Sequence, residues 1–86
     1  QGLESKLRHT YSDQKKQGVT YSLYEWIQHQ LGNPEYIRLF KAWEASGFRR
    51  ALTPTFYRKD TSKAFSFDNL NLEQWKHAVR KLNKGA

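Results

Sequence analysis

The chain is organised around residues 52–75, which read Leu-Thr-Pro-Thr-Phe-Tyr-Arg-Lys-Asp-Thr-Ser-Lys-Ala-Phe-Ser-Phe-Asp-Asn-Leu-Asn-Leu-Glu-Gln-Trp. Residues 55–59 and 64–67 both carry apolar or aromatic side chains that favour β-strands. Residues 60–63 between them are Asp-Thr-Ser-Lys, a polar sequence typical of turns. The pattern predicts a short β-hairpin whose strands are residues 55–59 and 64–67.

A helix is expected after the hairpin, over about residues 72–83, because apolar side chains recur there at near-helical spacing. The predicted apolar stripe, which would cover the hairpin, consists of Leu72, Trp75, Val79 and Leu82. The rest of the helix surface is mostly basic and carries Lys76, His77, Arg80, Lys81 and Lys84. A basic amphipathic helix can lie along a groove of duplex DNA. A membrane surface is the less favoured partner, because the apolar stripe is needed to cover the hairpin.

Three further helices are expected before the hairpin. The first spans residues 3–17 and ends at Gly18. The second follows a cap at Thr20 or Ser22 and ends at Gly32. Each of these boundaries rests on a residue type that ordinarily starts or stops a helix.

The third helix begins at Asn33-Pro34, an N-cap followed by proline at the first helical position, and ends at Gly47. The expected buried faces of the three helices consist of Leu3, Leu7 and Tyr11, then Leu23, Trp26, Ile27 and Leu31, then Tyr36, Leu39, Phe40 and Trp43. We expect Trp43 and Trp75 to be buried and to join the helical part to the hairpin, since both lie on apolar stripes.

These elements predict one small α+β domain, residues 1–86, that is mainly helical. Three helices over residues 3–47 precede a C-terminal strand–strand–helix (ββα) unit over residues 48–86. Gln1-Gly2 resembles the pair left by a cleaved tag, so we expect it to lie outside the native chain. The sequence has no cysteine, as is common in reducing compartments, and no apolar stretch approaches the length of a membrane span. We therefore expect a cytoplasmic protein.

Many residues of the C-terminal part follow the pattern Pro-Ser-Ile-Asp-Arg-x-Asp, then Gly-Tyr-x-x-Asp-Asn-Ile/Leu, then a helix with a late Asn and a Gly. The positions that match it are Pro54, Arg58, Asp60, Lys63, Phe65 in place of Tyr, Asp68, Asn69, Leu70, Asn83 and Gly85. Residues 43–48 and Leu52 match the lead-in of the same pattern, Trp-x-x-Ser-Gly-Tyr/Phe. The chain thus resembles, over about half its length, the HNH (ββα-metal, or His-Me finger) nuclease domains of phage-encoded proteins.

The resemblance implies DNA as the partner, a phage or mobile-element origin, and the host cytoplasm as the location. One position argues against nuclease activity. Where the family has an acidic residue before the arginine, this chain has Tyr57, and a phenol near neutral pH is a poor ligand for Mg²⁺ or Mn²⁺. The hairpin also contains no histidine that could act as a general base. We therefore expect a degenerate motif with no metal, no cofactor and no cleavage.

If the protein were a nickase with a variant active site, its catalytic candidates would be Tyr57, Asp60 and Asn69, with Asp60 replacing the lost carboxylate and Mg²⁺ or Mn²⁺ as cofactor. Turn chemistry is favoured for Asp60 and Asp68, because aspartates in turns commonly bond nearby backbone groups. Asn69 is expected to hold the hairpin loop, as its counterpart does in the family. The histidines are too far apart in the sequence for a local metal motif and are expected at the surface: His9, His29 and His77.

The formal charge of +7 is concentrated in the C-terminal part. Residues 1–48 contain six Lys and Arg against five Asp and Glu, whereas residues 49–86 contain nine against three. Such a basic region suits a polyanion, because phosphate contacts by Lys and Arg release condensed counterions. The side chains expected to contact phosphates are Arg49, Arg50, Arg58, Lys59, Lys63, Lys76, Arg80 and Lys81. The simpler alternative is a basic surface that only keeps the protein soluble.

The favoured function is that of a small basic protein that binds double-stranded DNA mainly through its phosphates. Two alternatives remain open from the sequence. One is the metal-dependent nickase with a variant active site. The other is a phage accessory protein whose basic surface binds and inhibits a host protein with an acidic surface.

Overall fold

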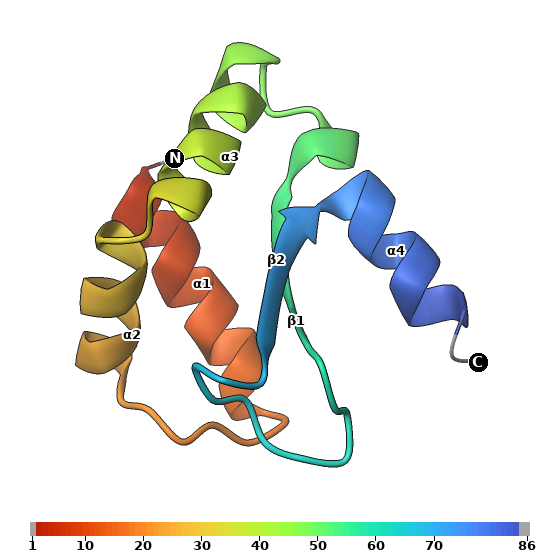
Figure 1. The fold of residues 1–86 in the computed structure, drawn as a ribbon. Helices are drawn as coiled ribbons and strands as arrows, with labels where there is room; N and C mark the ends of the chain where they lie inside the picture. Colours follow the sequence, from red (N-terminus) through yellow and green to blue (C-terminus); the bar gives the residue numbers. More distant parts are fainter. Residues whose placement is uncertain (1, 85–86) are drawn as a thin grey trace.

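The computed structural model describes the backbone of residues 2–84, with side chains as far as Lys81, as an α+β domain of four α-helices and a two-stranded antiparallel sheet (Figure 1). The elements in chain order are α1 (Leu3–Lys15), α2 (Leu23–Leu31), α3 (Pro34–Ala45), a short 3₁₀ helix η1 (Arg50–Leu52), β1 (Pro54–Arg58), β2 (Leu70–Gln74) and α4 (Trp75–Lys84). The described chain therefore ends in a strand–strand–helix unit, as expected. Among the described helices, none has both the length and the apolar composition of a membrane span.

The capping signals place the starts of α2 and α3 correctly. The Ser22 hydroxyl accepts a hydrogen bond from the N–H of Glu25 at 3.1 Å, and the Glu25 carboxylate accepts one from the N–H of Ser22 at 2.9 Å, which makes a capping box. The Asn33 side chain accepts a hydrogen bond from the N–H of Glu35 at 3.1 Å and caps α3. Helix α1 ends at Lys15, slightly earlier than expected.

The predicted apolar faces of these three helices supply most of the core. Their buried members are Leu7, Trp26, Ile27, Tyr36, Leu39, Phe40 and Trp43. Leu3, Tyr11 and Leu23 are partly buried and pack against this group. Leu31, the last residue of α2, is 38% exposed, so its expected place on the buried face is wrong.

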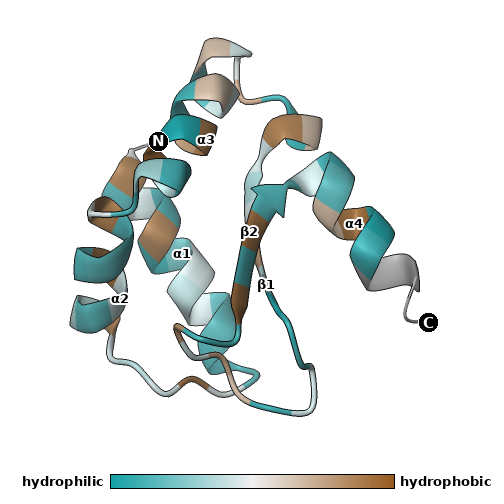
Figure 2. Cartoon of the chain, in the orientation of Figure 1, coloured by the Kyte–Doolittle hydropathy of each residue, from teal (hydrophilic) through white to brown (hydrophobic). Residues whose placement is uncertain are grey.

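The second strand differs from the predicted one. Strand β2 is Leu70–Gln74 rather than residues 64–67, and its register with β1 runs from Pro54 opposite Gln74 to Arg58 opposite Leu70. The β2 sequence, Leu-Asn-Leu-Glu-Gln, alternates apolar and polar residues at its start, as a strand with one buried face does (Figure 2). The strands are joined by a long loop, residues 59–69, in place of the tight turn expected at residues 60–63.

Residues 64–67 belong to this loop, but Phe65 still enters the core. Its N–H donates to the carbonyl oxygen of Gly18 at 3.0 Å, and its carbonyl oxygen accepts from the N–H of Thr20 at 2.9 Å. These bonds make an isolated parallel bridge to Val19, and the Phe65 side chain is buried. The β preference of this segment therefore corresponds to pairing with the chain after α1, not to pairing with β1.

Phe56 contributes most of the aromatic contact between the sheet and the helical part, a role expected of Trp43 and Trp75. Its ring lies edge-on to Trp26, with 4.7 Å between ring centroids. Trp43 is buried as expected. Trp75 is only half-buried, because it stands at the first position of α4, where the guanidinium of Arg50 lies 5.5 Å from its ring.

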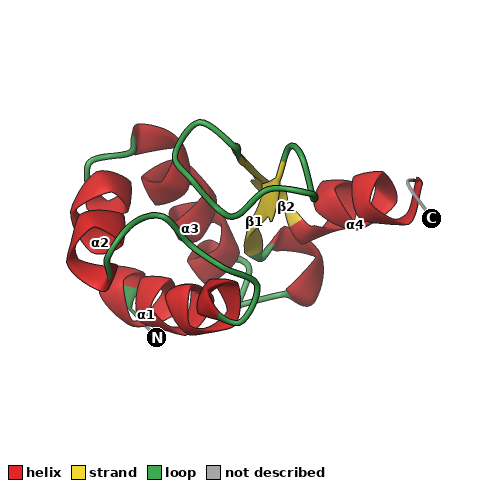
Figure 3. Ribbon diagram, turned by 90° about the horizontal axis from the view of Figure 1, so that it is seen from below, coloured by secondary structure: helices red, strands yellow, loops and turns green. Residues whose placement is uncertain are grey.

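Helix α4 lies on the opposite side of the two strands from α1, α2 and α3, as Figure 3 shows from below. It begins at Trp75 rather than at Leu72, because Leu72 belongs to β2. Ala78 is fully buried where α4 meets the strands and η1. Outside the described part of the structure are the side chains of Leu82, Asn83 and Lys84 and all of Gln1, Gly85 and Ala86.

Candidate nucleic-acid interface

The two faces of the sheet meet different surroundings. Phe56 and Leu72 are paired across the strands and pack against the core built by α1, α2 and α3. Tyr57 and Glu73 alternate to the other face, where their side chains connect to Lys81 of α4. Phe56 and Tyr57 therefore point in opposite directions, as successive residues of a strand do. We use the term α4 face for the side formed by Tyr57, Glu73, helix α4, η1 and residues 59–63, the first part of the loop.

Tyr57, Glu73 and Lys81 form a hydrogen-bonded cluster on the α4 face. The Tyr57 hydroxyl donates to the Glu73 carboxylate, and the Lys81 ammonium lies 3.0 Å from both oxygens of the same carboxylate. The hydrogen bond from Tyr57, and after it the one from Lys81, holds the pKa of Glu73 below its usual range. Burial raises the pKa of Tyr57, and its hydrogen bond to Glu73 raises it further. Near neutral pH, this cluster holds an ionised carboxylate between a phenol and an ammonium group.

The cluster does not fit a divalent metal ion. Tyr57 stands where the HNH resemblance would place a carboxylate, and its hydroxyl is engaged as a donor to Glu73. The one carboxylate beside it is already neutralised by Lys81. Among the residues that the structure describes, no three His, Asp or Glu side chains gather closely enough to hold a metal. The hydrogen-bond donors of the Tyr57–Glu73–Lys81 cluster surround an anion, whereas Mg²⁺ and Mn²⁺ need several oxygen ligands that are free to coordinate.

Asn69 fastens the loop of residues 59–69. Its side chain is buried; Oδ1 accepts from the N–H of Asp60 at 2.8 Å, and Nδ2 donates to the carbonyl oxygens of Asp60 and Ala64, both at 3.0 Å. This is the structural role expected of Asn69. Next to it, the Asp68 carboxylate accepts a hydrogen bond from the Ser66 hydroxyl at 2.6 Å.

Asp60 lies on the exposed surface of the same loop and bonds within its own turn. Its carboxylate accepts from the N–H of Ser62 at 3.0 Å and from the Ser62 hydroxyl at 2.6 Å, and these bonds lower its pKa. The side chains of the three catalytic candidates are therefore each engaged with a different group. The side chain of Tyr57 is bound to Glu73, that of Asp60 to Ser62, and that of Asn69 to loop backbone.

Three of the cations expected to contact phosphate are engaged within the molecule. Arg58 donates to the Gln17 side chain at 2.9 Å and to the carbonyl oxygen of Lys63 at 3.1 Å. Its guanidinium also lies 5.2 Å from the Phe65 ring. The other two are Arg50, which covers Trp75, and Lys81, which pairs with Glu73. Arg58 thus joins the loop to the end of α1, and its loss would disturb the fold as well as the surface charge.

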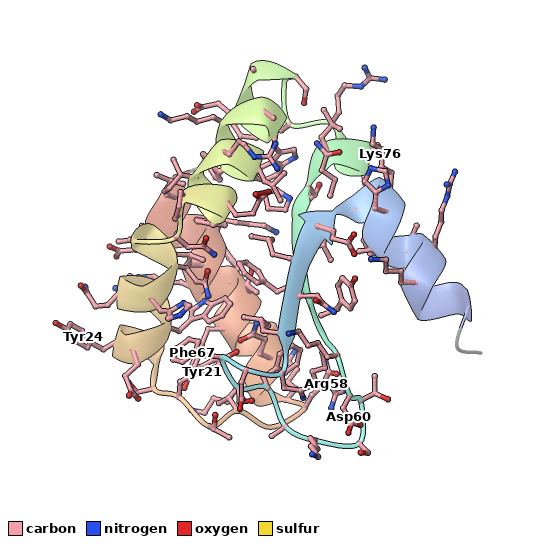
Figure 4. The ribbon with its side chains drawn as sticks, viewed as in Figure 1. Tyr21, Tyr24, Arg58, Asp60, Phe67 and Lys76 are labelled. Carbon is pink, nitrogen blue, oxygen red and sulfur yellow. The ribbon has the colours of Figure 1, made fainter. Side chains whose placement is uncertain are left out.

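The remaining cations of the set are exposed, and no ion pair engages them within the described residues: Arg49, Lys59, Lys63, Lys76 and Arg80. The strand register divides them into two groups. Arg49, Lys76 and Arg80 lie near the end of the sheet where β1 begins and β2 ends, and we call them the upper group. Lys59 and Lys63 lie in the loop at the other end, and we call them the lower group. Figure 4 shows the two ends through Lys76 and Asp60.

An aromatic stack ties the loop of residues 59–69 to α2, and no feature of the sequence predicted it. The ring of Phe67 stacks on His29, with 4.0 Å between ring centroids, and on Tyr21, with 4.6 Å. Figure 4 shows Phe67 and Tyr21 together, while Tyr24 of α2 points away from the domain and is 72% exposed. All three histidines are exposed, as expected. The partners of this stack are distant in sequence and share no motif, so only the fold brings them together.

Glu73 is the other residue of the candidate site that the sequence analysis did not single out. The β2 alternation is the signal that could have placed it opposite the core and next to α4. Comparison of the chain with protein-family models, with curated proteins and with solved structures finds no significant match.

Proposed function

We propose that this domain binds double-stranded DNA, with weak sequence preference, by placing phosphates against its α4 face. The observation that carries the proposal is the set of exposed cations that form no ion pair in the described part of the chain, namely the upper group Arg49, Lys76 and Arg80 and the lower group Lys59 and Lys63. Phosphate contacts by such side chains release counterions, and they position a protein without reading bases.

The separation of the two groups supports a duplex as the partner. Five paired residues separate the ends of the sheet, which is a span of about 13 Å at the usual strand rise. The major groove of B-DNA is about 12 Å wide. Because the upper and lower groups lie at opposite ends of this sheet, each group can contact a different backbone of one duplex. A single strand would offer one backbone only.

Like-charge crowding also supports an anionic partner. Lys76 and Arg80 are four residues apart on α4 and both are exposed, so their positive charges repel each other in the free protein. A phosphate between or beside them would relieve that repulsion. The first turn of α4 contains no acidic residue that could relieve the repulsion instead.

We propose further that the protein does not cut the DNA. The order strand, loop, strand, helix and the bonds of Asn69 support the resemblance to HNH nuclease domains, and hence DNA as the partner. The catalytic candidates, however, are each engaged elsewhere, and Tyr57 replaces the expected metal-binding carboxylate. The domain would then keep the binding function of such a nuclease without its chemistry.

Binding is tested by fluorescence anisotropy on two labelled duplexes of unrelated sequence, across a series of salt concentrations. Lys76→Ala/Arg80→Ala and Lys59→Ala/Lys63→Ala should each weaken binding similarly on both duplexes and lower the slope of log K against log salt by about 2. The matched control is Lys15→Ala/Lys16→Ala, which also removes two charges but from the end of α1. Equal losses from the control pair would show diffuse attraction and would refute a role for the α4 face.

Cleavage is tested separately by incubating supercoiled plasmid with the protein, with and without Mg²⁺ or Mn²⁺. We expect the plasmid to remain supercoiled. Nicking that requires the metal, and that disappears in Asp60→Ala but not in Asp13→Ala, would favour the variant nickase instead. Tight binding to an acidic protein with little binding to DNA at any salt concentration would favour the host-protein alternative.

A further inference from the structure

We infer that Tyr57 and Lys81 form a phosphate-binding site that the protein fills with its own Glu73 carboxylate. The inference rests on the proposed function, and it identifies a contact that the free protein keeps closed. The cations named above bind DNA in the resting structure, whereas this site would bind a phosphate only when Glu73 yields its place. Glu73 therefore limits how tightly the domain holds a nucleic acid.

The donors of the cluster suit a phosphodiester as well as a carboxylate. The Lys81 ammonium lies 3.0 Å from both Glu73 oxygens, and the Tyr57 hydroxyl donates to the same group. A phosphodiester also presents two charged oxygens on one atom, and charge-assisted hydrogen bonds from Lys to carboxylate and to phosphate are alike in length and strength. The two donors come from β1 and α4, which pack against each other, so the two residues stay neighbours when Glu73 is displaced.

The surroundings of the cluster make Glu73 exceptional. It is the only acidic residue in the described part of β2 and α4, and on α4 the exposed neighbours are Lys76, His77 and Arg80. A duplex held by the upper group would therefore bring its phosphates close to a negative charge. The carboxylate, paired with Lys81, repels the backbone there and keeps Lys81 from contacting it.

The accessibility of the pair permits the exchange of Glu73 for a phosphate. The Lys81 side chain is 59% exposed and that of Glu73 is 28% exposed. Ion pairs at such exposure are weak, because water and salt compete with them. A phosphate can thus approach Lys81 from solvent without opening the core.

Glu73→Gln tests the inference with little change of shape, because the glutamine oxygen can still accept from Tyr57. In roughly 0.1 M salt we expect this variant to bind duplex DNA about three- to tenfold more tightly, and the salt slope to increase by about 0.9, as one added phosphate contact requires. The control is Glu44→Gln, which removes the same charge from an exposed position of α3. It should change the affinity by less than about twofold and leave the slope unchanged.

A second substitution assigns the gain to Lys81. In Glu73→Gln/Lys81→Gln, the added affinity and the added slope should both disappear. If Glu73→Gln gains no more than Glu44→Gln, or if the gain persists without Lys81, the inference is wrong. Circular dichroism melting of each variant shows whether it is folded.

Single substitutions in the protein that keeps Glu73 provide an independent test, which does not need a stable Glu73 variant. Because Glu73 is paired with Lys81 in that protein, Lys81→Gln should change the slope of log K against log salt by less than about 0.3. Lys76→Gln should lower the same slope by about 0.9. Equal slope losses would show that Lys81 already binds DNA in the parent protein, and would overturn the inference. A parent protein that does not bind DNA at all would instead refute the proposed function.

Discussion

Asn69 replaces, with one side chain, the backbone hydrogen bonds that a tight hairpin turn would have supplied. Its amide accepts one hydrogen bond from the Asp60 N–H and donates to the carbonyl oxygens of Asp60 and Ala64. An asparagine amide can donate and accept at once, which neither aspartate nor leucine can do in the same volume. The long loop of residues 59–69 keeps its shape for this reason, and with it the positions of Lys59 and Lys63.

Asn69→Ala should lower the free energy of unfolding by about 2 to 3 kcal/mol, because it leaves buried loop groups without partners. Urea denaturation followed by circular dichroism measures the change. The matched control is Asn71→Ala in β2, two residues further along the chain, where the side chain is partly exposed and takes no part in the loop, with an expected cost under about 1 kcal/mol. Equal costs at the two positions would show that the Asn69 bonds contribute little.

The role of Asn69 was predictable from its place in a motif, whereas the Tyr57–Glu73–Lys81 cluster was not. The sequence did mark Tyr57 as unusual, since it stands where the resemblance expects an acid. Its partner could be found only once β2 was placed correctly, because the strand register and the docking of α4 bring the two side chains together. Pairing between distant side chains is a property of the fold and has no local signal.

At the scale of elements, the segment from Leu70 to Trp75 shows why one strand was misplaced. Leu72, Trp75 and Val79 recur at spacings that suit a helix, while Leu70-Asn-Leu-Glu suits a strand equally well. The competing candidate at residues 64–67 was richer in aromatics, but its burial comes from Phe65 packing beside Val19. The helices were predicted more accurately, because Ser22 and Asn33 mark their starts chemically.

The docking of α4 depends on close approach at Ala78, which is fully buried. Ala78→Leu should lower the free energy of unfolding by about 1 to 3 kcal/mol, because the added atoms push the helix away from the strands. Ala45→Leu is the matched control, since Ala45 is exposed at the end of α3, and it should change stability by less than about 0.5 kcal/mol. A variant at Ala78 as stable as the control would mean that α4 packs loosely.

The link between α4 and β2 should also depend on pH. The pKa of Glu73 is lowered in the folded protein, chiefly by Tyr57 and then by Lys81, so its contribution to stability is present above about pH 4.3 and is lost as the pH falls through the lowered value. Thermal melting between pH 6 and about pH 2 should therefore show a steeper loss for the parent than for Glu73→Gln. Glu44→Gln should follow the parent. Parallel curves for all three would show that the cluster does not stabilise the docking of α4.

At the scale of the whole molecule, the core joins the two parts of the chain into one unit. Phe56 from β1 and Phe65 from the loop pack into the same core as Trp26 and Tyr36. The sequence predicted the class of fold and the order of helices, strands and final helix. It did not predict which residues join the two parts, because the choice of Trp43 and Trp75 followed apolar stripes and assumed the wrong strand. The concentration of positive charge in residues 49–86, in contrast, could be read from the sequence without any knowledge of the fold.

Unfolding in alkali should show that this core opens as one unit. Tyr21 and Tyr36 are buried, with hydroxyls that donate to the Gln14 side chain at 2.6 Å and to the carbonyl oxygen of Leu3 at 2.7 Å, and burial raises the pKa of both phenols. A raised folded-state pKa means that their contribution to stability is complete below about pH 10, and is lost as the pH rises from there toward the raised values.

The two buried phenols should ionise only when the domain unfolds, so the late part of the tyrosinate absorbance change should coincide with the loss of circular dichroism. Tyr36→Phe, which removes one buried phenol, should reduce the amplitude of that late part of the change. Complete ionisation of the tyrosines before any loss of circular dichroism would contradict the prediction. It would mean that the parts of the core around Tyr21 and Tyr36 open locally, independently of the sheet.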